Sequence, residues 1–255
     1  MKPFKPRVLI LTGDGLSGQN ELAEAFALAG FEPHLRHIND LISEHFGLDW
    51  LLSEYQALGI PGGASFGDHI ACGKLLALKI QGGLGWDLNR FAERGGMVMG
   101  VGNGFQILLS LQVFGRDISF TQNASGEPVN TWMKLHPQGG RSPWLRGAGT
   151  LELPVRQRFG RIVFASNRKV EILTKMERQG MMCLRYDSDP SGSESAIAGL
   201  CDPTGRILGL MPHPELYTRW TQHPEWTLSP GRASAPGQGL LLFENAYQEV
   251  TRGRI

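Results

Sequence analysis

The sequence has few cysteines, no long hydrophobic run and almost no net charge. Its three cysteines, Cys72, Cys183 and Cys201, form no CxxC pair and no zinc-binding pattern, so we expect reduced thiols and no metal site. No apolar run approaches the ~20 residues that span a bilayer, and the basic start of the chain leads into a strand-length run rather than a signal peptide. These absences predict a cytoplasmic protein without membrane contact.

The balance of charges also argues against a nucleic-acid partner. The 25 Lys and Arg residues and 24 Asp and Glu residues leave a net charge of +1. One stretch, from Arg156 to Arg178, is locally basic, but Glu171 and Glu177 interrupt it and no aromatic residues alternate with its cations. The favoured interpretation is the solvated face of short strands. A phosphate site and a docking face for an acidic partner are the alternatives.

The first part of the chain alternates between strand-like and helix-like segments. Arg7–Thr12 is a continuous apolar run that suits a strand buried on both faces. Residues 20–29 have helical spacing, with Asn20 as the expected N-cap and Gly30 as the stop. Further strands are expected at residues 34–38 and 55–60. This alternation predicts an α/β fold with helices on both faces of a sheet.

After about Gly115 the pattern changes to short strands separated by loops rich in Gly, Pro and Asn. The turn Cys201-Asp-Pro-Thr-Gly205 predicts a hairpin between two of these strands. We interpret the chain, residues 1–255, as one domain with an added small β region. The later strands are expected at residues 131–135, 150–154, 161–165, 181–186, 196–200 and 207–210, and a closing helix at residues 239–250.

The most informative segment runs from Gly95 to Leu109 (GGMVMGVGNGFQILL). It predicts a buried strand, a sharp turn and a helix, which is the shape of a nucleophile elbow. The residue at the tip of the turn is Gly102, which has no side chain that could attack a substrate. The segment therefore combines the backbone of a hydrolytic site with the absence of a nucleophile.

Three motifs together carry a family resemblance. They are Pro61–Asp68 (PGGASFGD), Gly100–Gln106 (GVGNGFQ) and Gly209–Glu215 (GLMPHPE). In this order and at these distances they resemble the class I glutamine amidotransferases, and more narrowly the glutaminase subunit of phosphoribosylformylglycinamidine synthase. The resemblance extends from about Arg7 to Glu249. It implies a flavodoxin-like sheet flanked by helices.

The resemblance also implies the roles of individual residues. In the family a cysteine thiolate at the elbow attacks the side-chain amide of glutamine, and the ammonia passes to a synthetase subunit. His213 matches the base and Glu215 the carboxylate that orients it. The N–H groups of Gly63 and Asn103 match the oxyanion positions. Gly102 stands where the cysteine belongs. No cofactor is implied for this chain, whereas ATP and Mg are implied for the synthetase partner.

The chain departs from the family pattern at several other positions. Residues 154–160 replace a segment that resembles HGEGR in the family, residues 189–193 replace an Asn-Pro-Asn-Gly-Ser turn, and Leu216 replaces an arginine. Several independent departures favour natural divergence over an engineered knock-out. Neither Cys72 nor Ser65 matches the nucleophile position, so we expect little or no glutaminase activity.

Two functions remain open at this point. The chain can be a subunit of such a synthase with a structural role, or a stand-alone binding or scaffold protein that retains a glutamine-sized pocket.

A third signal, for nucleotide binding, is weaker. Gly13-Asp-Gly-Leu-Ser-Gly18 matches the dinucleotide fingerprint GxGxxG, with Asp40 as a candidate ribose ligand, but the family resemblance accounts for this turn without a nucleotide.

Overall fold

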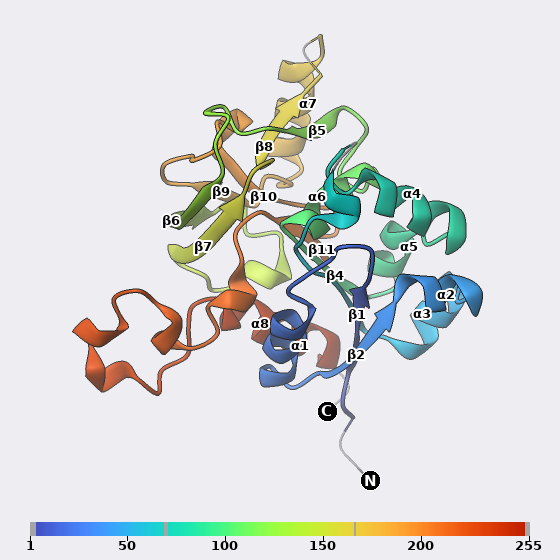
Figure 1. Cartoon of the computed structure of the whole chain (residues 1–255), viewed down its shortest axis with the longest axis horizontal. Coiled ribbons are helices and arrows are strands. Elements are labelled where there is room, and N and C mark those ends of the chain that lie inside the picture. The colour runs from blue at the N-terminus through green and yellow to red at the C-terminus, as the bar shows by residue number, and fades with distance from the viewer. Residues whose placement is uncertain (1–3, 69–70, 166, 253–255) are drawn as a thin grey trace.

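The computed structural model describes residues 4–68, 71–165 and 167–252 of the chain. Its centre is a nine-stranded sheet with the order β2-β1-β3-β4-β11-β10-β9-β6-β7. Helices cover both faces of this sheet, as Figure 1 shows. The predicted α/β fold is confirmed. Within the described residues, no helix is both long enough and apolar enough to cross a membrane.

One half of the sheet is parallel and resembles the flavodoxin arrangement. It consists of five strands: β1 (Arg7–Thr12), β2 (Glu32–His37), β3 (Ala57–Ile60), β4 (Met97–Val101) and β11 (Ile207–Leu210). Every residue of β3, β4 and β11 is buried. Continuous apolar sequence in these strands follows from burial on both faces of the sheet.

The later strands extend this sheet in antiparallel pairing rather than building a second layer. β10 and β11 form the predicted hairpin, and β9, β6 and β7 follow at its outer side. β5 and β8 pair separately, as a two-stranded sheet. The bounds are β5 (Ile118–Thr121), β6 (Val129–Pro137), β7 (Leu151–Gln157), β8 (Arg161–Phe164), β9 (Leu184–Tyr186) and β10 (Ile197–Cys201).

Two hydrophobic clusters lie on the two faces of the sheet. Alternation along β1 sends Val8 and Ile10 into one cluster and Leu9 and Leu11 into the other. The first cluster contains α1 and α8, and the second contains α2 to α7. The bounds are α1 (Gln19–Leu28), α2 (Ile38–Ser43), α3 (Leu48–Glu54), α4 (Lys74–Gly83), α5 (Leu88–Glu93), α6 (Asn103–Ser110), α7 (Lys169–Arg178) and α8 (Leu240–Thr251).

Two local predictions are wrong. Asn20 does not cap α1, because the helix begins at Gln19 and Gly18, in the left-handed conformation, occupies the N-cap position. The basic stretch is not a strand face throughout. Its second half is α7, an amphipathic helix that buries Ile172 and Met176 and exposes its charges.

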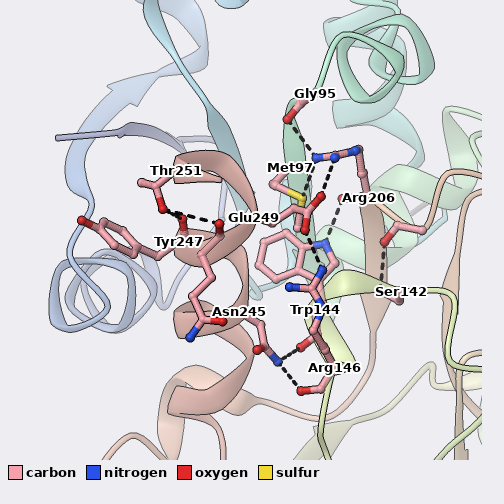
Figure 2. Close-up of polar contacts among 12 residues, drawn as sticks. Gly95, Met97, Ser142, Trp144, Arg146, Arg206, Asn245, Tyr247, Glu249 and Thr251 are labelled. Carbon is pink, nitrogen blue, oxygen red and sulfur yellow. Dashed lines mark hydrogen bonds and ion pairs between the residues drawn. The ribbon is translucent and has the colours of Figure 1, made fainter. Parts of the chain in front are cut away.

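A partly buried carboxylate joins the last helix to the rest of the chain (Figure 2). Glu249 on α8 accepts hydrogen bonds from Arg146 and from Arg206, both at 2.6 Å. On the same helix the Asn245 side chain donates to the backbone carbonyls of Trp144 and Arg146. Trp144 itself is fully buried and donates its indole N–H to the Arg206 carbonyl. These contacts fix α8 against the face of the sheet that carries α1.

We therefore predict that Glu249→Gln lowers the free energy of unfolding by about 1.5–3 kcal/mol, the usual range for a hydrogen bond to a charged group. Urea denaturation of both proteins measures this difference. Glu244→Gln is the matched control, because Glu244 lies exposed on the same helix, and it should change stability by less than about 0.5 kcal/mol. Equal effects of the two substitutions would contradict the assignment.

The same contact predicts a dependence on pH. Burial favours the neutral carboxyl of Glu249, but the Arg146 hydrogen bond and the charges of Arg206, Arg146 and Arg252 outweigh it, so its pKa lies below the ordinary value of 4.5. A lowered pKa contributes stability that is complete above the ordinary pKa and is lost as pH falls through the folded pKa. The stability difference between the chain and Glu249→Gln should therefore shrink below pH 4.5.

Candidate active site

The predicted elbow lies between β4 and α6. Gly102 has φ 53° and ψ −111°, a conformation that a residue with a Cβ rarely adopts. Its N–H donates to the Leu210 carbonyl at 2.9 Å, and its own carbonyl accepts from the amides of Phe105 and Gln106. The sharp turn is therefore present in this chain, and glycine adopts it at little cost.

The sheet register brings His213 to the elbow. β4 and β11 pair in parallel with Val101 opposite Leu210, so the residues that follow both strands meet at one edge of the sheet. A Cβ placed on Gly102 would lie 3.2 Å from His213 Cε1 and 3.4 Å from His213 Nε2. Two segments that are far apart in the sequence thus form one site.

His213 is held by a carboxylate that lies two residues further along the chain. Its Nδ1 lies 2.8 Å from Glu215 Oε1, and both residues are buried, at 8% and 4% exposure. The His213 amide also donates to the Pro154 carbonyl of β7. In this contact the Glu215 carboxylate accepts a hydrogen bond from Nδ1–H, which leaves Nε2 facing Gly102. Nε2 has no hydrogen-bond partner within residues 4–68, 71–165 and 167–252.

Two backbone amides complete the elbow end of the site. Asn103 is the first residue of α6, where a helix leaves its N–H groups without acceptors. Gly63 follows β3 and has φ 129°, and a Cβ there would lie 2.5 Å from the Gly15 carbonyl oxygen. In the described part of the chain, neither of these N–H groups donates to another atom. Both residues line the same cavity as Gly102 and His213.

The glycine-rich turn after β1 supports this arrangement instead of offering a nucleotide cradle. Leu16 pairs with Gly63 as an isolated antiparallel bridge. The Ser17 amide donates to the Gly62 carbonyl, and the Ala64 amide donates to the Gly15 carbonyl. The backbone groups of Gly15 and Ser17 are thus hydrogen-bonded to the Gly62–Ala64 segment. Asp40, the candidate ribose ligand, lies exposed on α2.

A chain of side-chain hydrogen bonds links the elbow to the opposite wall. Asn103 accepts from the Ser65 amide and donates to Asp68 Oδ1 and, at 2.7 Å, to Gln106 Oε1. Gln106 in turn donates to the Phe159 carbonyl at 2.6 Å. We did not predict Gln106 as a site residue. Its signal was its place in the GVGNGFQ motif, one helical turn after the elbow.

The cavity enclosed by these groups has a volume of about 340 Å³, which is at the small end of the range for ligand sites. Arg156 and Arg158 line it, although the sequence indicated solvated strand positions for them. Among the described residues, no three His, Cys, Asp or Glu side chains are arranged to hold a metal. The lining residues are Gly63, Ala64, Gly67, Asp68, Gly102, Asn103, Gln106, Arg156, Gln157, Arg158, Phe159, Met211 and His213.

Comparison with known proteins identifies the family of the chain. Residues 5–249 match the CobB/CobQ-like glutamine amidotransferase domain. The chain is 34% identical to the phosphoribosylformylglycinamidine synthase subunit PurQ of Dehalococcoides mccartyi, over 96% of this chain and 97% of that protein. It is 30% identical to PurQ of Methanococcus maripaludis, over 95% and 97% of the two chains.

Solved structures show the same relationship. A chain of the PurLQS structure from Thermotoga maritima superimposes with a TM-score of 0.72 and 27% identity, over 96% of this chain and 99% of that one. A glutamine amidotransferase from the same organism shares the fold, with a TM-score of 0.56 and 14% identity. The chain therefore belongs to the class I glutamine amidotransferases, in the CobB/CobQ-like family and close to PurQ.

Proposed function

We propose that this chain is a cytoplasmic, non-hydrolysing counterpart of PurQ that serves as a subunit of a phosphoribosylformylglycinamidine synthase in purine biosynthesis. The single observation that carries the proposal is the glycine at the elbow. The turn, the His213–Glu215 pair and the two free amides are all present, but position 102 holds no thiol.

The missing side chain removes the covalent route of the family. In that route a thiolate attacks the amide carbon of glutamine, a thioester forms and ammonia leaves. His213 has no thiol proton to accept from position 102, because glycine carries no side chain there; a Cβ at that position would lie 3.4 Å from His213 Nε2. The amides of Gly63 and Asn103 can still polarise a carbonyl oxygen, but polarisation alone leaves only a small residual rate.

Two other side chains near the elbow are unsuitable as nucleophiles. Burial first, and the negative charge of Asp68 second, raise the pKa of the Cys72 thiol to about 12. Almost no thiolate therefore exists near neutral pH. Ser65 is 2% exposed, and its hydroxyl has no hydrogen-bond partner in the described part of the chain, so no base activates it.

The partner in this proposal is a larger synthetase subunit that binds ATP and Mg. The structural relative is a chain of a PurLQS assembly, and the match covers nearly the whole length of both chains. In such a complex this chain would act as a structural subunit, and free ammonia would be the nitrogen source. Co-purification of the chain with the synthetase subunit of its own organism tests the association, and failure to associate would favour the stand-alone binding protein.

We predict that the unmodified chain releases no ammonia from glutamine above background, with or without the synthetase subunit. Loss of a nucleophile lowers turnover by roughly 10⁶-fold in a well-studied hydrolase. Gly102→Cys should raise the rate of ammonia release at least about tenfold over that of the unmodified chain, because its Cβ would lie 3.4 Å from His213 Nε2. A coupled glutamate dehydrogenase assay measures both.

Gly102→Ala and the double variant Gly102→Cys/His213→Ala are the controls, and both should stay silent. Ammonia release by the unmodified chain would show that another residue attacks and would overturn the proposal.

We also predict that Cys72 reacts slowly with iodoacetamide. With a pKa of about 12, its thiolate fraction at pH 8 is more than about a thousandfold below that of an ordinary cysteine. The labelling rate should rise about tenfold per pH unit between pH 8 and pH 10. Peptide mass spectrometry measures this rate against a short cysteine peptide as control. Labelling as fast as that of the free peptide would mean that Cys72 is an available nucleophile.

A further inference from the structure

The wall of the cavity opposite the elbow carries two cations. Arg156 is on β7, Arg158 follows it, and both are exposed. Neither forms an ion pair within the residues that the structure describes. Among the lining residues that the structure describes, Asp68 is the single carboxylate, and it already accepts a hydrogen bond from Asn103. The lining therefore carries excess positive charge.

The backbone that presents these arginines is fixed on several sides. Asn123 is 3% exposed, donates to the Gln157 carbonyl and accepts from the Gly160 amide. The backbone N–H of Asn123 donates to the Arg158 carbonyl at 3.1 Å. The Gln106 side chain holds the Phe159 carbonyl. The two guanidinium groups thus project from an anchored segment and not from a free loop.

The elbow end of the cavity offers hydrogen-bond donors. The amides of Gly63 and Asn103 have no partner in the described part of the chain, and Gly102 leaves open the space that a thiol would fill. A carboxylate accepts at both oxygens, whereas a carboxamide must also place two N–H groups against acceptors. His213 Nε2 accepts when the imidazole is neutral and donates when it is charged, so it suits either ligand. The free amides therefore favour a carboxylate.

We propose that this cavity binds an amino dicarboxylate, L-glutamate, in preference to L-glutamine. The side-chain carboxylate lies at the amides of Gly63 and Asn103, and the positive field of Arg156 and Arg158 favours the additional negative charge. Asp68 supplies a carboxylate suited to the ammonium group. This inference rests on the proposed function, because a site that still hydrolysed glutamine would release glutamate rather than retain it. The chain would then respond to the product of the reaction that its relatives catalyse.

Isothermal titration calorimetry of the purified chain with L-glutamate and with L-glutamine tests the proposal. We expect glutamate to bind at least about tenfold more tightly at low ionic strength, since hydrogen bonds to charged groups are the stronger ones. The preference should weaken as salt is added. The double variant Arg156→Gln/Arg158→Gln should bring the two affinities to within about twofold of each other.

Arg178→Gln is the matched control, because Arg178 lies exposed on α7 outside the cavity lining, and it should leave the preference unchanged. Thermal unfolding of each variant checks that the fold is intact. Equal or tighter binding of glutamine, binding of neither amino acid, or an unchanged preference in the double variant would each overturn the inference. None of these results would affect the proposed function, which fails only if ammonia appears in the glutamine titration of the unmodified chain or if no synthetase subunit associates with it.

Discussion

The site depends on the parallel pairing of β4 with β11. Val101 lies opposite Leu210, and the Gly102 amide donates to the Leu210 carbonyl, so β4 and β11 end at the same edge of the sheet. The segment after β4 turns sharply into α6, and the segment after β11 continues to His213. A shift of one residue in this register would turn alternate side chains to the other face and separate the elbow from the imidazole.

The retention of this geometry without a nucleophile has a structural reason. The elbow also lets α6 pack close to the sheet, and a Cβ on Gly104 would lie 2.0 Å from the Ile60 carbonyl oxygen. The Gly15–Ser17 turn and the Gly62–Ala64 segment hold each other by backbone hydrogen bonds. These contacts involve no catalytic atom. The turn, the two amides and the His213–Glu215 pair therefore keep their places without a side chain at position 102.

The sequence allowed the parallel half of the fold and the centre of the site to be predicted, because both depend on local signals. β1 matches the expected strand at Arg7–Thr12, and the motifs placed Gly102 and His213 at strand ends that share an edge. The helix α7 was missed because its charges masked its helical spacing. Arg156 and Arg158 were not recognised as cavity residues, since long-range contacts such as the pairing of β7 with β6 and the bridge from Val155 to Pro212 bring that segment to the elbow. Such long-range placement has no local pattern.

The central claim is that the elbow is intact and lacks only its nucleophile. The most direct measurement is intact-mass spectrometry after incubation with a diazoketone analogue of glutamine, which alkylates an activated thiol in a glutamine site. Our account predicts no adduct on the unmodified chain and a single adduct on Gly102→Cys, mapped to position 102 and dependent on His213. An adduct on the unmodified chain, at Cys72 or Ser65, would contradict the assignment of the missing nucleophile. An unlabelled Gly102→Cys variant would contradict the claim that the site geometry is retained.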